Sequence, residues 1–104
     1  MTSIDTGTLR ARQLERRNFV LVDILREQSF AKGHLPGAIN IVSDEIVRRA
    51  PQVVPDKHAP IVVYCASAAC KRAGLSAERL ERLGYTQVHH CVSGKKGWLA
   101  ALAQ

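Results

Sequence analysis

The residues with the most chemical potential are two cysteines, Cys65 and Cys70, within the stretch "IVVYCASAACKR" at positions 61–72. Cys65 ends an apolar run, and two basic residues, Lys71 and Arg72, directly follow Cys70. The thiolate is the nucleophilic form of cysteine, and nearby positive charge lowers the thiol pKa below its free value of about 8.5. The pattern therefore predicts a reactive thiolate at Cys65. Such a thiolate can attack an electrophilic sulfur and hold the sulfane sulfur as a persulfide.

The main chain around Cys65 is expected to supply further hydrogen-bond donors. Residues 61–65 have the pattern of a buried strand, and residues 71–83 have that of a helix. Ligands of open parallel sheets bind beyond the carboxyl ends of the strands, and free N–H groups at a helix N-terminus favour an anion. We therefore expect an anion-binding cradle around Cys65, in which Lys71 and Arg72 attract the donor. The main-chain donors assigned to it belong to Ala66, Ser67, Ala68, Ala69, Cys70 and Lys71. The alternative is a cysteine simply buried at a strand end, which is common for this residue type.

Cys70 has two interpretations that the sequence leaves open. It could be a resolving thiol that attacks a Cys65 persulfide or sulfenate and closes a disulfide. It could instead be a small residue at the helix start, where its N–H matters more than its sulfur. A zinc site is not expected, because no second pair of ligands with finger-like spacing accompanies these cysteines. His89 and Cys91 share one face of a strand, but two ligands do not make a metal site.

The elements that must position Cys65 alternate between strands and helices. Short apolar runs predict strands at residues 19–24 and 61–65, with weaker strands at 86–92 and 37–41. Helical patterns cover residues 8–17, 27–32, 43–49, 71–83 and 98–103, with N-caps expected at Thr6 or Thr8 and at Ser43, and a stop at Gly84. The inner stripe of the fourth helix consists of Ala73, Ser76, Ala77, Leu80 and Leu83, and Trp98 is expected to pack the last helix onto the sheet. This alternation predicts an α/β domain with a mainly parallel sheet.

Length and composition are those of a single globular domain over residues 1–104, with 46% hydrophobic and 23% charged residues. No apolar run approaches the roughly 20 residues needed to span a bilayer, and the N-terminus lacks an apolar signal core. Three cysteines are an odd number for a disulfide scaffold. We therefore expect no membrane association and a cytoplasmic location, where thiols stay reduced.

The net charge of +6 raises the question of nucleic acid. Basic pairs are spread along the chain at residues 16–17, 48–49, 71–72 and 95–96. No RNA-binding aromatic motif or zinc-finger spacing interleaves them, and the aromatic residues are one Trp, two Tyr and two Phe. The charge therefore predicts attraction of small anions rather than nucleic-acid binding.

Three stretches together resemble the rhodanese (sulfurtransferase) domain family. They are "LVDILREQSFAKGHLPGAINI" at 21–41, "IVVYCASAACKR" at 61–72 and "LERLGYTQVHHCVSGKKGW" at 80–98. The resemblance extends from about Thr8 to Ala101. It implies a five-stranded parallel sheet flanked by helices on both faces, with Cys65 as the single catalytic cysteine. It also implies sulfur transfer from thiosulfate or a persulfide donor to a thiol or cyanide, without a metal or organic cofactor.

The sequence departs from the family pattern in the active loop. Leu25 stands where many members have an arginine, Ala68 where the loop has a glycine, and Cys70 where it has an arginine. The segment 65–84 is also longer than the commonest form. The extra length is either an enlarged loop, which would let Arg72 act as the loop arginine, or half a turn more helix.

These observations lead to three functional hypotheses. The first is a sulfurtransferase that acts on a small anionic donor such as thiosulfate. The second is a sulfur-relay or redox carrier that uses Cys65 and Cys70 with a protein partner. The third is an oxyanion enzyme, because a larger loop would resemble the family's cell-cycle phosphatase and arsenate-reductase relatives.

Two polar residues outside the loop are expected to support the site. Asp23 ends a strand, where it could hold the active loop through hydrogen bonds or cap the following turn. His34 lies in "GHLPG", where Pro36 and Gly37 predict a turn and the ring is expected to bind nearby backbone. The pair at residues 95–96 either extends a positive rim of the site or belongs to a solvated loop.

Overall fold

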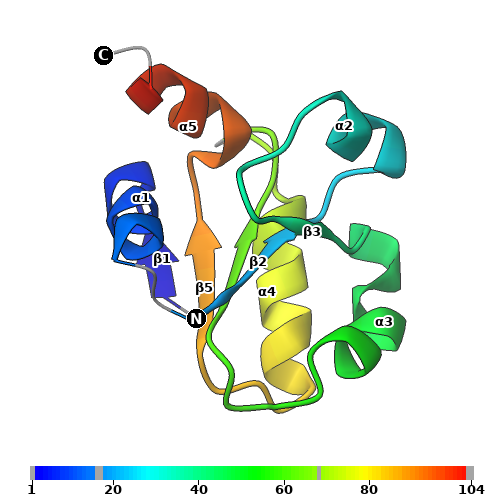
Figure 1. Ribbon diagram of the computed structural model, residues 1–104. Helices are drawn as coiled ribbons and strands as arrows, with labels where there is room; N and C mark the ends of the chain where they lie inside the picture. Colours follow the sequence, from blue (N-terminus) through cyan, green and yellow to red (C-terminus); the bar gives the residue numbers. More distant parts are fainter. Residues whose placement is uncertain (1, 16–17, 68, 103–104) are drawn as a thin grey trace.

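A computed structural model describes residues 2–15, 18–67 and 69–102. Residues 101 and 102 are described as main chain only. Its described strands form one sheet in the order β1-β5-β4-β2-β3, and every pairing is parallel (Figure 1). The strands are β1 (Thr2–Ile4), β2 (Val20–Asp23), β3 (Ile39–Asn40), β4 (Ile61–Tyr64) and β5 (Val88–Cys91). The predicted five-stranded parallel sheet is thus confirmed. The carboxyl ends of β4 and β5 point toward α5, α2 and the loop before α4.

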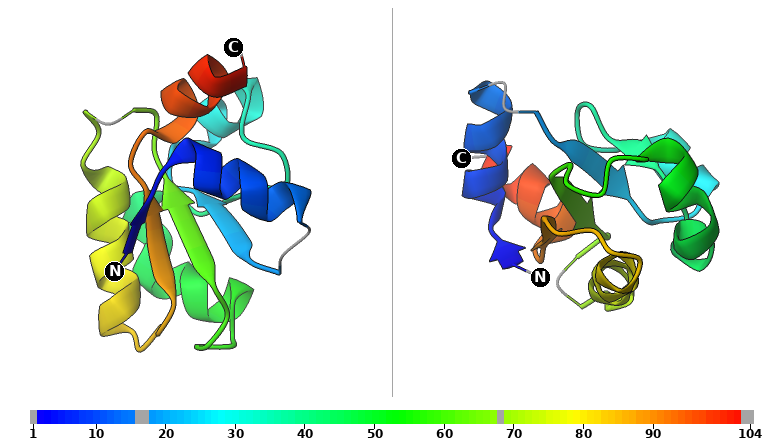
Figure 2. Two further views of the ribbon diagram at one scale, coloured as in Figure 1. Left: turned by 90° about the vertical axis from the view of Figure 1, so that its left-hand side faces the viewer. Right: turned by 90° about the horizontal axis from the view of Figure 1, so that it is seen from below.

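Helices cover both faces of the sheet. They are α1 (Thr6–Leu14), α2 (Glu27–Lys32), α3 (Ile46–Val53), α4 (Arg72–Arg82) and α5 (Gly94–Leu102), with a 3-10 turn, η1 (Ser43–Glu45), before α3. Figure 2 shows α1 and α5 on one face and α3 and α4 on the other. Among the described residues, no helix has the length and apolar character needed to cross a bilayer.

The side chains of β4 and of Cys65, the residue that follows it, alternate between two apolar clusters, because successive residues of a strand point to opposite faces. Ile61, Val63 and Cys65 belong to the cluster under α3 and α4, here called the α4-side cluster. Val62 and Tyr64 belong to the cluster under α1 and α5, here called the α5-side cluster. All of these side chains are buried, as the unbroken apolar run predicted.

The inner stripe of α4 confirms its prediction. Ala73, Ser76, Ala77 and Leu80 are buried, and Leu83 packs partly buried against the same cluster. The helix is followed by Gly84 at φ 100°, a left-handed conformation that glycine adopts without steric cost.

Several local predictions were wrong. Strand β1 was missed, because its three residues carry no apolar run. The N-cap of α1 is neither Thr6 nor Thr8 but Asp5, whose carboxylate accepts from Thr8 N at 2.7 Å. Ser43 does not cap a helix either, since it lies inside η1 and is itself buried.

The ends of two other helices also differ from prediction. Helix α5 begins at Gly94, four positions before the predicted start at Trp98, because two glycines give residues 94–97 the sequence pattern of a loop. Helix α1 ends at Leu14 with Glu15 as its C-cap, and the predicted helical residues 16–17 lie outside the described residues.

Candidate functional site

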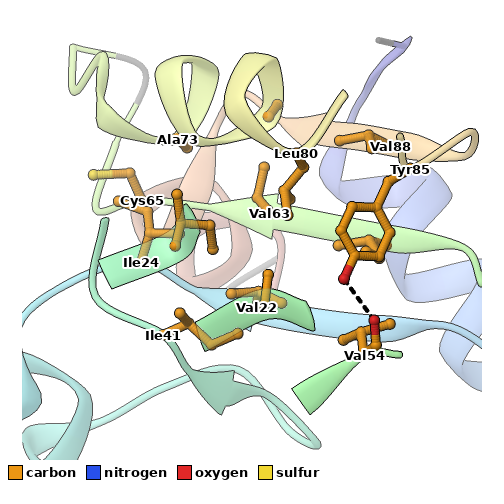
Figure 3. Packing of buried hydrophobic residues seen from close by; sticks show 14 residues of the cluster. Val22, Ile24, Ile41, Val54, Val63, Cys65, Ala73, Leu80, Tyr85 and Val88 are labelled. Atoms are coloured by element: carbon orange, nitrogen blue, oxygen red, sulfur yellow. Dashed lines mark hydrogen bonds between the residues drawn. The ribbon is translucent and has the colours of Figure 1, made fainter. Parts of the chain in front are cut away.

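Cys65 is the first residue beyond β4, and a disulfide joins it to Cys70, with a Cα–Cα distance of 6.2 Å. Its side chain is only 2% exposed. Figure 3 shows its sulfur pointing away from the other labelled side chains of the α4-side cluster, toward the segment before α4. The sequence predicts a free thiolate here, whereas Cys65 in the structure is in the oxidised, bonded state. Cys91 is a buried free cysteine.

The loop between Cys65 and α4 spans residues 66–71, of which Ala68 lies outside the described residues. Cys70 N–H donates to the Ser67 carbonyl at 3.1 Å, so this predicted cradle donor is bonded within the loop. Within the described part of the loop, the N–H groups of Ala66, Ser67 and Ala69 donate to no acceptor among the described residues. The anion cradle to which these donors are assigned stays a prediction.

Helix α4 begins at Arg72, so the described residues between Cys65 and α4 are loop. Its N-cap is Lys71, which makes no side-chain capping bond, and both basic side chains are exposed. An uncapped N-terminus with two cations beside it is an electropositive setting for an anion.

The N-terminus of α5 fixes the first residues of the loop. Lys95 N donates to the Cys65 carbonyl at 3.0 Å, and Lys96 N donates to the Ala66 carbonyl at 2.9 Å. Gly94 makes this approach feasible, because a Cβ on it would overlap the carbonyl oxygen of Cys65. Its φ of 61° is also left-handed. Sequence reasoning missed this contact, although a glycine at a strand-to-helix junction was its visible signal.

Asp23 is fully buried at the carboxyl end of β2, where both of its carboxylate oxygens are engaged. Oδ1 accepts from Leu25 N at 2.9 Å, and Oδ2 accepts from the Tyr64 hydroxyl at 2.9 Å. Lys95 Nζ lies 3.8 Å from Oδ2 and donates to the Ser29 carbonyl at 3.0 Å. Asp23 therefore caps the turn after β2. It also links β2 to β4 through Tyr64 and to α5 through Lys95.

Tyr64 continues this buried network. Its hydroxyl accepts from Leu35 N at 3.1 Å while it donates to Asp23. Burial raises the pKa of Tyr64 far above its ordinary value, with a further contribution from the charge of Asp23. The phenol therefore stays protonated and serves as a fixed donor.

His34 lies outside this network. Its Nδ1 is 2.8 Å from the Phe30 carbonyl, and its ring stacks on Phe30 with centroids 3.7 Å apart. The predicted contact between the ring and nearby backbone is thus present, one turn back along the chain. His34 and Cys65 are not brought together by any contact among the described residues.

Two hollows flank the site. A cavity of about 530 Å³ lies between α2 and α5, and it is lined by Ser29, Lys32, Gly33, His34, Leu35, Pro36, Lys95, Trp98 and Leu99. A groove of about 340 Å³ lies between α4 and β5, and it is lined by Cys70, Lys71, Gly74, Leu75, Glu78 and His90. Cys70 thus opens onto the groove, whereas Cys65 lines neither hollow.

His89 and Cys91 of β5 have no third metal-ligating side chain close to them among the described residues. Across the described residues, no three His, Cys, Asp or Glu side chains gather closely enough to hold a metal ion. Cys91 packs in the α5-side cluster, and His90 lines the groove together with Gly74 of α4.

The fold and the site together define the class of protein. A five-stranded parallel sheet carries a cysteine directly after its central strand, and a loop and helix follow that cysteine. Residues 6–101 match the model of the Rhodanese-like domain family. The chain belongs to this family.

Two curated relatives cover different shares of the chain. Thiosulfate sulfurtransferase PspE of Escherichia coli K12 is 35% identical over 69 residues, which is 66% of this chain and 64% of PspE. The HTH-type transcriptional regulator Rv0324 of Mycobacterium tuberculosis is 35% identical over 102 residues, which is 95% of this chain but 44% of that protein. The chain thus spans less than two thirds of the length of these relatives.

Solved structures show the same fold. A thiosulfate sulfurtransferase from Pseudomonas aeruginosa superposes with a TM-score of 0.87 at 31% identity, covering 97% of this chain and 19% of that one. The human single-domain sulfurtransferase TSTD1 superposes with a TM-score of 0.83 at 22% identity and covers 96% of both chains. The TSTD1 similarity concerns the fold alone.

Proposed function

We propose that this protein is a sulfurtransferase that carries sulfane sulfur on Cys65, taken from thiosulfate or a persulfide donor. The observation that carries the proposal is the position of Cys65 between β4 and the uncapped N-terminus of α4. The names of relatives such as PspE support the reaction class. A compartment that keeps Cys65 reduced, such as the cytoplasm, fits this chemistry.

The reaction needs Cys65 as a thiolate. The thiolate attacks the sulfane sulfur of thiosulfate, the S–S bond of thiosulfate breaks, and sulfite leaves with the bonding electron pair. The persulfide on Cys65 then gives its outer sulfur to a thiophilic acceptor, and the Cys65 thiolate returns. The loop N–H groups, with Lys71 and Arg72, stabilise the negative charge at each stage.

The Cys65–Cys70 disulfide blocks this reaction, because the nucleophilic sulfur is already bonded. The account therefore requires reduced protein for turnover. A steady-state assay of thiosulfate:cyanide sulfur transfer tests it with wild type, Cys65→Ser and Cys70→Ser after reduction and removal of the reductant. Loss in Cys65→Ser alone supports the proposal, and retained turnover in that variant overturns it.

A second candidate is a sulfur-relay or redox carrier that exchanges sulfur or disulfides with a protein partner. The specific observation in its favour is the disulfide, since it shows that the sulfurs of Cys65 and Cys70 can meet. Negligible thiosulfate turnover by reduced wild type, together with ready closure of this disulfide, would favour the carrier over the enzyme.

A further inference from the structure

The two sulfurs of the disulfide differ in their access to solvent. Cys65 is 2% exposed within the α4-side cluster, whereas Cys70 is partly exposed at the edge of that cluster and lines the groove between α4 and β5. In thiol–disulfide exchange, access decides which sulfur an incoming thiolate attacks. An external thiol can therefore reach Cys70 and not Cys65.

We propose that the cysteine pair gives this chain a second activity, the reductive release of the carried sulfur as hydrogen sulfide. Cys70 is the resolving nucleophile, and the groove beside it admits a small anionic thiol as reductant. The proposal rests on the proposed function, because it begins from a persulfide on Cys65.

In the first step, the Cys70 thiolate attacks the inner sulfur of the Cys65 persulfide. The Cys65–Cys70 bond forms, the persulfide S–S bond breaks, and hydrosulfide leaves with the electron pair. The sulfane sulfur is reduced by two electrons while the two cysteines are oxidised by two, so the step balances. The disulfide in the structure is the product of this step, and its existence shows that Cys70 Sγ reaches Cys65 Sγ.

In the second step, an external thiolate attacks Cys70 Sγ, and Cys65 leaves as a thiolate. A second external thiolate then attacks the external sulfur of the mixed disulfide and releases the Cys70 thiolate. The sum is one sulfane sulfur and two thiols converted to hydrogen sulfide and one external disulfide. Cys65 is restored in its nucleophilic state, ready for another donor.

The groove suits a small thiol that carries negative charge. Its volume of about 340 Å³ falls at the lower end of the range of small-molecule pockets, about 300–1,000 Å³. Lys71 lies in its lining next to Cys70, and the exposed Arg72 follows, whereas the acidic residue of the lining, Glu78, lies further along α4. Glutathione, an anionic tripeptide thiol, is the probe that matches both features.

A single-turnover experiment tests sulfide release. Reduced wild type, Cys70→Ser and Cys70→Ala are treated with thiosulfate, freed of excess donor, and assayed for sulfide and for protein mass without added reductant. The proposal predicts sulfide release with loss of the persulfide in wild type, and a retained adduct at Cys65 without sulfide in both variants. Equal sulfide release by the variants overturns it, and so does a wild-type adduct that moves intact to Cys70.

The same samples separate two kinds of failure. If the Cys70 variants form no adduct at Cys65 at all, the proposed sulfurtransferase function fails. If they form the adduct and wild type nevertheless keeps it, only the second activity fails.

The entry point of the reductant is tested on oxidised wild type with limiting glutathione, quenched rapidly with N-ethylmaleimide. Fragmentation mass spectrometry should find glutathione on Cys70 and maleimide on Cys65, and the opposite distribution contradicts the accessibility argument. Lys71→Glu should slow reduction by glutathione but not by cationic cysteamine, whereas Arg10→Glu, on the exposed surface of α1, should change neither rate. Reduction by a protein dithiol that outpaces glutathione and ignores Lys71→Glu would overturn the groove assignment.

Discussion

Cys65 and Cys91 lie near the carboxyl ends of neighbouring strands but face different surroundings. The register pairs Cys91 with Tyr64, so Cys65 is one residue further along. That single step places Cys65 in the α4-side cluster, next to the loop, and Cys91 in the α5-side cluster with Trp98. Both are almost fully buried. Burial alone therefore does not distinguish a candidate nucleophile from a core cysteine.

The two cysteines differ in the residues that come after them in the chain. Burial raises the pKa of Cys91, which keeps it a neutral thiol. Cys65 is succeeded by a loop whose described part has unpaired N–H groups, by Cys70 and by two exposed cations. A cysteine becomes chemically useful here because a strand ends in an open loop beside a helix N-terminus.

The largest expected effect is the difference in sulfur-transfer activity between a variant of Cys65 and a variant of Cys91. Cys65→Ser should reduce thiosulfate:cyanide transfer by at least about a thousandfold, the scale seen when a catalytic nucleophile is removed. Cys91→Ala should leave the rate per folded molecule unchanged. A rate that falls with Cys91→Ala and survives Cys65→Ser would reverse the comparison.

The buried network of Asp23, Tyr64 and Lys95 should give the next largest effect, which is on stability. Asp23→Ala leaves the Tyr64 hydroxyl and the Leu25 N–H without their partner and Lys95 without its counter-charge. We expect the free energy of unfolding to fall by about 3 kcal/mol. Urea denaturation measures this loss, and the exposed Asp44→Ala serves as a matched control. A loss no larger than that of the control would show that the network is not structural.

Two glycines allow a finer test of how the loop of Cys65 is held. Both Gly84 and Gly94 have positive φ, so alanine at either costs about 1–2 kcal/mol of stability. Only at Gly94 would the new methyl group collide with the Cys65 carbonyl, while nothing lies within 4 Å of it at Gly84. Gly94→Ala should therefore lower both stability and sulfur transfer, and Gly84→Ala only stability. Equal activity losses in the two variants would contradict the role of α5.

The smallest expected effect concerns pH and Cys91. Below the ordinary thiol pKa of about 8.5, both the folded and the unfolded chain keep Cys91 protonated. Cys91 therefore adds no pH dependence to the free energy of unfolding in that range. Because its folded pKa is raised, the unfolded chain ionises first at higher pH, and stability falls as pH rises. Between pH 7.5 and pH 9.5, the free energy of unfolding measured with urea should fall more in wild type than in Cys91→Ala. An identical loss in both would remove Cys91 from this dependence.

The sequence was sufficient for the parallel sheet and for Cys65 at a strand end, because "FVLVDI" and "IVVYC" are apolar runs that a covered parallel strand requires. It could not reveal the disulfide, since a spacing of five residues does not decide whether two sulfurs meet. The contact of α5 with the Cys65 carbonyl was also hidden, because it depends on main-chain atoms of segments far apart in the sequence. The same holds for the ion pair of Asp23 with Lys95.

The most direct test of the account is mass spectrometry of reduced protein after thiosulfate treatment, with Cys70→Ser included to prevent resolution. The account predicts an adduct of ~32 Da on Cys65, the mass of one added sulfur at the persulfide stage. An unmodified Cys65, or an adduct confined to Cys91, would contradict it.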